Sequence, residues 1–101
     1  MQLVEILLPT ADNEGQAFPA EAFARVRDEL VARHGGVTAH LRAPAQGVWA
    51  GAHATVSEDV VVIEVMVGSL DRGWWSSYRT ELERRFRQEA IVIRAHPIER
   101  L

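Results

Sequence analysis

The run Val60-Val61-Val62-Ile63-Glu64-Val65-Met66-Val67 is the most β-branched stretch of this 101-residue chain. β-Branched side chains fit an extended, half-buried backbone. Glu64 is the one charged residue of the run, so a strand formed here is apolar on both faces. A strand of that kind has to be covered on both faces. The run therefore predicts a central β-strand at 60–67.

Three further segments alternate in polarity with the two-residue period of a strand. They are 2–8, 37–42 and 90–95. A proline follows each of them, and proline interrupts strand pairing. Residues 46–49 are expected to resume the pairing of the 37–42 strand, so that 43–58 forms a long hairpin with its tip at 51–54.

Two segments carry the three- and four-residue apolar spacing of amphipathic helices. The first helix is expected to begin after Phe18-Pro19, because proline fits the first helical turn, and to end at Gly35-Gly36. The second is expected to begin at Ser69 as its cap and to run to Arg87. Its large apolar side chains are Trp74, Trp75, Tyr78, Leu82 and Phe86. Trp74 and Trp75 lie about 100° apart around the helix, so the expected buried stripe is Trp75, Tyr78, Leu82 and Phe86.

The order strand, helix, strand, strand, helix, strand is that of the split βαβ arrangement. It predicts one α+β domain over 1–101, a ferredoxin-like βαββαβ sandwich. Right-handed crossovers then give a four-stranded antiparallel sheet of order 4132 with both helices on one face. A chain of this length has room for one hydrophobic core.

Composition excludes several classes of function. The formal net charge is -3 and the isoelectric point is near 5.8, so electrostatics gives no reason to expect nucleic acid or an anionic membrane as a partner. The chain has no cysteine and no lysine, which excludes thiolate chemistry and lysine Schiff bases. No apolar run is long enough to span a bilayer. We expect a cytoplasmic protein.

The strand alternation predicts two unlike faces on the sheet. The face toward the helices is apolar, and the opposite face mixes large apolar side chains with charged ones. A monomer would leave an apolar patch in water that is large enough to drive association. The sequence therefore predicts a homodimer through this open face. The residues expected on the open face are Leu3, Glu5, Leu7, Thr38, His40, Arg42, Val62, Glu64, Met66, Val92 and Arg94.

In element order and size the chain resembles the dimeric α+β barrel group. That group includes small monooxygenases and many uncharacterised bacterial domains. The resemblance implies two sheets packed face to face, often with a ligand between them. The strings 22–27 and 83–87, together with Trp74-Trp75, also look like small uncharacterised bacterial proteins, which implies no activity.

Glu5 and Glu64 are expected to be neighbours on the open face. Two carboxylates in a partly desolvated groove resist joint ionisation, which is a usual way to prepare a general acid or base. The alternative is structural: Glu5 pairs with Arg94, and Glu64 pairs with His40 or Arg42 across strands.

Candidate catalytic residues are therefore Glu5, Glu64 and His40, and candidate ligand-binding residues are Arg42, Arg94 and Trp49. Trp49 lies in the expected hairpin, where an aromatic serves an interface, a ligand mouth or simple packing. No metal site is expected, because His40 and His96 fall on opposite edges of the predicted sheet, and no cofactor is expected.

The leading hypothesis is a homodimeric domain of unknown biochemical function that binds a small molecule or acts as an interaction domain. The alternative is a cofactor-independent enzyme, monooxygenase-like or acid–base, with its site on the open face. In that alternative His40 and Arg94 orient the substrate. An enzyme predicts a hollow that touches Glu5, Glu64 and His40, and an interaction module predicts that these groups are buried in satisfied pairs.

Overall fold

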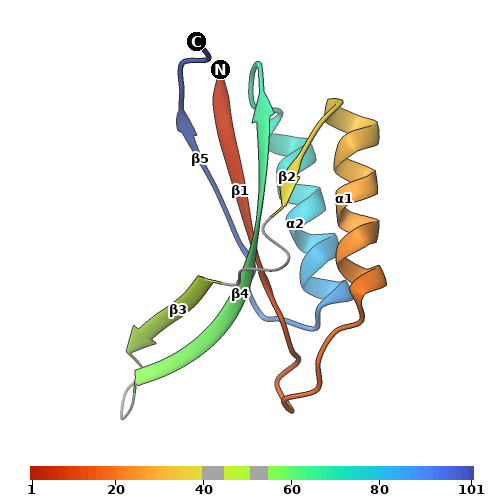
Figure 1. Ribbon diagram of the computed structural model, residues 1–101, viewed down its shortest axis with the longest axis vertical. Helices are drawn as coiled ribbons and strands as arrows, with labels where there is room; N and C mark the ends of the chain where they lie inside the picture. Colours follow the sequence, from red (N-terminus) through yellow and green to blue (C-terminus); the bar gives the residue numbers. More distant parts are fainter. Residues whose placement is uncertain (40–44, 51–54) are drawn as a thin grey trace.

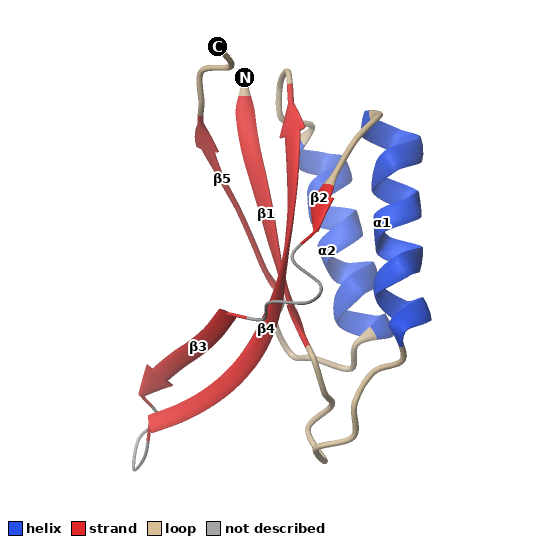
Figure 2. Cartoon of the chain, in the orientation of Figure 1, coloured by secondary structure: helices blue, strands red, loops and turns tan. Residues whose placement is uncertain are grey.

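The computed structural model describes residues 1–39, 45–50 and 55–101, and the side chains of 1–38 and 60–101. The chain is a small α+β protein with its helices on one side of a sheet (Figures 1 and 2). Along the chain the elements are β1 (Gln2–Pro9), α1 (Ala20–His34), β2 (Thr38–Ala39), β3 (Ala45–Ala50), β4 (Thr55–Val67), α2 (Arg72–Arg85) and β5 (Val92–Pro97).

The sheet is antiparallel and its strand order is β2-β4-β1-β5, with β3 paired to β4 beside this path. β1 lies between β4 and β5. It pairs with β4 from Gln2 opposite Val67 to Pro9 opposite Val60, and with β5 from Gln2 opposite Pro97. β5 and β2 therefore form the edges of the main sheet.

The prediction of a four-stranded ferredoxin-like sheet of order 4132 is wrong, because the sheet has five strands. The expected strand at 37–42 appears in the described residues as Thr38–Ala39 alone, and 40–44 lie outside them. Beyond Pro44 the chain forms a separate strand, β3, which pairs with the first part of β4 from Ala45 opposite Val60 to Ala50 opposite Thr55.

The physical reason for the additional strand is the length of β4. β4 has 13 residues and β1 has 8, so the beginning of β4 extends past the end of β1. The backbone groups of that extension still need hydrogen-bond partners, and β3 provides them. Figure 1 shows the β3–β4 ribbon curving away from the body of the molecule.

α1 follows the expected boundaries. It begins after Pro19, and Gly35 ends it with a left-handed φ of 84°, donating its backbone N–H to the Val31 carbonyl. Glycine takes this conformation without a Cβ penalty. The stripe Phe23, Val26 and Leu30 is buried. No helix of the described chain has the length and apolar character that crossing a bilayer requires.

α2 begins at Arg72, later than Ser69 predicted. Asp71 is the N-cap, and its side chain accepts a hydrogen bond from the Trp74 backbone N–H. Asp71 is spaced correctly to reach this third helical N–H. Trp75, Tyr78, Leu82 and Phe86 are buried as expected.

Both helices pack on the face of the sheet that carries the alternate apolar residues. The core joins buried side chains of the sheet and of the helix layer, which are Val4, Ile6, Leu8, Phe23, Val26, Leu30, Val61, Ile63, Val65, Val67, Trp75, Tyr78, Leu82, Phe86 and Ile91. At one end of the core Phe18 packs edge-on against Phe86, with ring centroids 4.9 Å apart.

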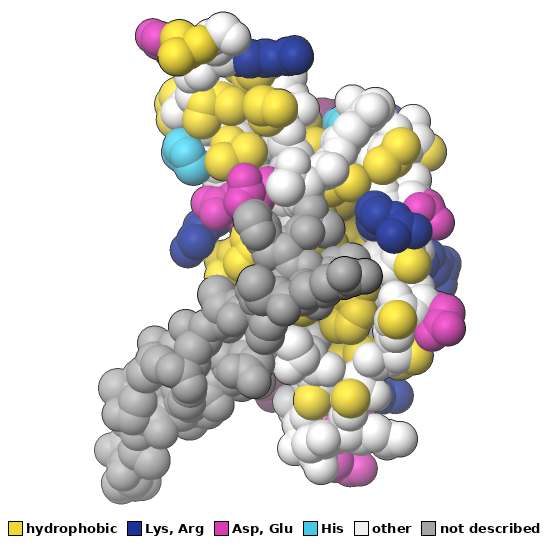
Figure 3. Space-filling view, in the orientation of Figure 1, with side chains coloured by type: hydrophobic (Ala, Val, Ile, Leu, Met, Phe, Trp, Pro, Cys, Tyr) yellow, Lys and Arg dark blue, Asp and Glu magenta, His cyan; other side chains and the backbone are white. Residues whose placement is uncertain are grey.

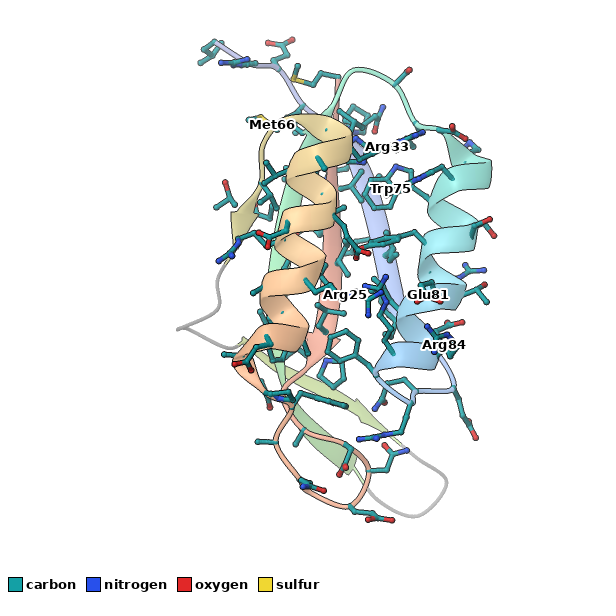
Figure 4. All side chains as sticks on the ribbon, turned by 90° about the vertical axis from the view of Figure 1, so that its right-hand side faces the viewer. Arg25, Arg33, Met66, Trp75, Glu81 and Arg84 are labelled. Atoms are coloured by element: carbon teal, nitrogen blue, oxygen red, sulfur yellow. The ribbon has the colours of Figure 1, made fainter. Side chains whose placement is uncertain are left out.

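An ion-pair network joins the outer sides of the two helices. Arg85 of α2 donates two hydrogen bonds to Glu29 of α1, at 2.6 and 2.7 Å, and the Tyr78 hydroxyl donates a third to Glu29 at 3.0 Å. Arg85 also donates to Glu81 at 2.7 Å. Figure 4 looks onto this helix layer, with Glu81 and Arg84 on α2. The Arg85 guanidinium holds the pKa of Glu29 below its usual value.

Candidate functional site on the open sheet face

The open sheet face is the side of the sheet that the helices leave uncovered. A row of side chains crosses it at the level of Glu5. Glu5 lies opposite Glu64 on β4 and opposite Arg94 on β5, and Thr38 of β2 lies opposite Glu64. Directly opposed residues bring their Cβ atoms to about 5 Å. The expected adjacency of Glu5, Glu64 and Arg94 is confirmed.

Glu5 has two basic neighbours. The Arg94 Nε donates to Glu5 Oε1 at 3.3 Å, and the His96 Nδ1 lies 3.9 Å from the same oxygen. The Glu5 side chain is 19% exposed, whereas the Arg94 side chain is 59% exposed. The carboxylate is thus sheltered in the sheet, and its cationic partner is largely in solvent.

Apolar side chains flank this charged row on both sides. Met66 is 50% exposed and Val92 is 52% exposed, while Leu3, Leu7 and Val62 are half-buried. Figure 3 shows hydrophobic side chains gathered over the ends of β1, β4 and β5, beside histidine, acidic and arginine groups. Nothing in the described chain covers these apolar groups.

A hollow of about 410 Å³ opens where this face meets the turn between α1 and β2. Glu64 supplies a carboxylate to its wall, Thr38 a hydroxyl, and Leu3 and Met66 apolar surface. Ligand pockets of small molecules have volumes of this order. Its full lining is Met1, Leu3, His34, Gly35, Gly36, Val37, Thr38, Glu64, Met66 and Arg100.

The wall of the hollow includes a half-buried histidine. The His34 ring stacks on Trp75, with centroids 5.2 Å apart and planes 4° apart, and meets Trp74 edge-on. Its Nε2 is buried without a hydrogen-bond partner among the described residues. Burial, with a contribution from the Arg33 guanidinium, lowers the pKa of His34. The neutral ring is therefore the form that the fold favours.

The remaining predicted site residues are not brought into this arrangement by the described structure. His40 and Arg42 lie outside the described residues. Trp49 belongs to β3, where its backbone lies opposite Val56. An enzyme was expected to show a hollow that touches Glu5, Glu64 and His40. Of these residues, Glu64 lines the hollow and Glu5 does not. Glu5 pairs with Arg94 instead.

Sequence reasoning missed His96, Thr38 and the turn at 34–37 as parts of the site. His96 could have been found, because it lies two residues after Arg94 and shares its face in a strand. The expected strand ended at Ala95, whereas β5 continues to Pro97. In the part of the chain that the structure describes, no three histidine, aspartate or glutamate side chains form a metal-binding group.

Comparisons with known proteins identify a fold and no family. No protein-family model matches the chain, and no curated protein matches it. A phage SAM lyase in complex with S-methyl-5'-thioadenosine has a similar structure, with a TM-score of 0.61 and 17% identity, over 94% of this chain and 79% of that one. A phage SAM lyase in the apo state gives a TM-score of 0.62 at 16% identity, over 94% and 78% of the two chains. At these identities the likeness shows the fold alone.

Proposed function

We propose that this chain is a self-associating domain that binds a small organic ligand at its open sheet face, which a second copy covers. The observation that carries the proposal is the uncovered apolar surface around the Glu5 row, where Met66 and Val92 are half exposed. Apolar patches that surround a few polar groups are typical of interaction sites.

Charge complementarity supports a second copy as the occupant. The row reads acidic at Glu64 and Glu5 and basic at Arg94. In a face-to-face dimer whose twofold axis runs between the two sheets and parallel to β1, β5 of one copy lies across from β4 of the other. Arg94 of each copy then lies across from Glu64 of the partner subunit. An isologous interface of this kind is self-complementary. Arg94, 59% exposed, has the freedom to reach that second carboxylate.

The hollow beside Glu64 supports a small molecule as the ligand. Its volume of about 410 Å³ suits a nucleoside-sized compound. Two structures of similar fold are phage SAM lyases, one of them in complex with S-methyl-5'-thioadenosine. We therefore take adenosine-bearing thioethers and sulfoniums as the ligand class. Within this class we expect a sulfonium to bind more tightly than a thioether, because its positive charge is attracted to the Glu64 carboxylate.

The experiment combines sedimentation and titration. Wild type should sediment as a dimer at micromolar concentration, and Met66→Glu should sediment as a folded monomer because it buries an unpaired charge in the interface. Val31→Glu is the matched control, since Val31 is an equally exposed apolar residue at 43% on α1, and it should remain a dimer. A monomeric wild type, or a dimeric Met66→Glu, would refute the covered face.

The same preparations test the ligand. SAM and S-methyl-5'-thioadenosine are titrated by calorimetry into wild type and Glu64→Gln. We expect both to bind wild type, and Glu64→Gln to weaken SAM binding about tenfold while changing the uncharged thioether little, because only SAM carries the sulfonium charge. Absence of heat from both compounds, or an equal loss for both, would contradict the proposed ligand class.

Acid–base catalysis by Glu64 is a second candidate function. The observation that favours it is the Glu64 carboxylate in the wall of the hollow, where a bound substrate can meet a proton acceptor. SAM consumption followed by chromatography separates this candidate from binding alone. Turnover by wild type that Glu64→Gln abolishes supports catalysis; SAM that stays intact with wild type rules it out.

A further inference from the structure

A second hollow lies on the helix side of the sheet, between α2 and β5. It has a volume of about 370 Å³, and we call it the α2–β5 cleft. Its floor is formed by helix-facing residues of the sheet, and α2 forms its wall. Its lining is Gln2, Val4, Leu70, Arg72, Trp75, Ser76, Arg79, Ile93, Arg94 and Ala95. It opens beside β5, an edge strand, and is distinct from the hollow at Glu64.

The wall contributed by α2 is a cationic strip. Arg72, Ser76 and Arg79 follow one another at four- and three-residue steps, so they share one face of the helix. The two arginines are two turns apart, a rise of about 10 Å. Two long, flexible guanidinium side chains at this spacing can close on one bound group from both sides.

Arg72 and Arg79 have no ion-pair partner in the part of the chain that the structure describes. Within the described residues, neither Arg72 nor Arg79 forms an ion pair or a side-chain hydrogen bond, and the cleft lining contains no carboxylate. Most other arginines are neutralised by a carboxylate: Arg25, Arg27, Arg33, Arg84, Arg85, Arg87 and Arg94. The chain has a net charge of -3, but the lining of this cleft carries positive charge and no acidic side chain.

The cleft wall also contains an unsatisfied buried donor. Trp75 is 7% exposed and lines the cleft, and its indole Nε1 has no hydrogen-bond partner among the described residues. A buried donor left unpaired is destabilising. The Trp75 indole is thus a further donor without a partner among the described residues, and it belongs to a side chain that lines the cleft.

We propose that the α2–β5 cleft binds a small organic phosphate. Two guanidinium groups match the double charge of a phosphate monoester, and arginine binds phosphate oxygens through paired, charge-assisted hydrogen bonds. The Ser76 hydroxyl lies between the arginines as a further donor. Val4, Leu70 and Ile93 supply apolar surface for the organic part of the ligand. The site is separate from the proposed ligand hollow and stands whether or not the chain self-associates.

Phenyl phosphate is the probe, because it joins a phosphate monoester to an apolar group. It is titrated by calorimetry into wild type, Arg72→Gln, Arg79→Gln and Arg27→Gln, with inorganic phosphate and phenol as partial ligands. Arg27→Gln is the matched control: it removes the same charge from an exposed helical position on α1, where Arg27 pairs only with its neighbour Asp28. Circular dichroism checks that each variant is folded.

We expect phenyl phosphate to bind wild type more tightly than either partial ligand. Arg72→Gln and Arg79→Gln should each lower the affinity about tenfold, the effect of losing a charge-assisted hydrogen bond, and Arg27→Gln should leave it unchanged. Tryptophan fluorescence should respond on binding, since Trp75 lines the cleft. No binding to wild type, or equal losses in all three variants, would overturn the proposal.

Discussion

The chain uses the same pair of groups, a carboxylate and a guanidinium, on both sides of its sheet, with different results. Between the helices, Arg85 holds Glu29 with two short hydrogen bonds while its side chain is 13% exposed. On the open face, Arg94 holds Glu5 with one bond of 3.3 Å while its side chain is 59% exposed. The first pair is completed within the chain, and the second leaves donors for something else.

The Glu29–Arg85 pair is also surrounded by more polar partners than the Glu5–Arg94 pair. Tyr78, Glu81 and Arg25 surround Glu29 and Arg85, so each group has several partners. Around Glu5 the neighbours are half-exposed apolar side chains and a histidine at 3.9 Å. A satisfied and partly buried network fixes a fold, whereas a charged row within an uncovered apolar face indicates a site. The Glu29–Arg85 network therefore stabilises the helix pair, and the open face is the surface that we propose for self-association.

Removing the helix-side pair should have the largest effect. Arg85→Ala leaves Glu29 without its main partner, and breaking a fully buried pair in this way costs about 3 to 5 kcal/mol. Because Glu29 remains 34% exposed, we expect about 2 kcal/mol of lost unfolding free energy, measured by urea denaturation of the monomeric Met66→Glu background.

Arg84→Ala is the control for that prediction. Arg84 pairs with Glu81 while 70% exposed, and ion pairs between solvent-exposed side chains add little to stability. If Arg85→Ala cost no more than Arg84→Ala, the Glu29–Arg85 pair would stabilise the fold no more than an exposed pair on the same helix, and its contrast with the exposed Glu5–Arg94 pair would fail.

A smaller effect is expected from pH through His34. Its folded pKa lies below the unfolded value of 6.5 because burial disfavours the charged ring. The unfolded chain therefore binds the proton first, so this contribution to stability is present above pH 6.5 and is lost as pH falls below it toward the folded pKa.

The measurement is the urea midpoint of wild type and His34→Phe between pH 7.5 and about 5.5, a range set by the ordinary titration of histidine. Phenylalanine keeps a flat ring between Trp74 and Trp75 and cannot titrate. We expect the midpoint of wild type to fall further than that of the variant. Equal falls of the two midpoints with pH would contradict a lowered pKa of His34 in the folded protein.

Sequence pattern was sufficient for those parts of the fold that local rules determine. The expected strands 2–8, 60–67 and 90–95 placed Glu5, Glu64 and Arg94 on one face, because side-chain parity in a strand depends only on position. The stripe of Phe23, Val26 and Leu30 likewise defined the buried side of α1.

Other features depend on competition between alternatives that a single sequence does not rank. Ser69 and Asp71 are both good helix caps, and Asp71 is the one whose carboxylate meets the Trp74 N–H. The sequence pattern indicated the pairing of 46–49 within a 43–58 hairpin, but it treated these residues as a continuation of the 37–42 strand, whereas β3 is a separate fifth strand paired with the extended β4. The Glu29–Arg85 pair joins residues 56 positions apart, and pairings at that distance carry no local signal.

The central claim is that the open face is covered in solution and the helix face is not. Because the chain has no cysteine, single thiols can report this directly: Val92→Cys on the open face and Val31→Cys on α1, which replace residues of 52% and 43% exposure. With a maleimide at micromolar protein, the account predicts that Val92→Cys reacts at least tenfold more slowly than Val31→Cys and that dilution removes the difference. Equal rates at every concentration would contradict it.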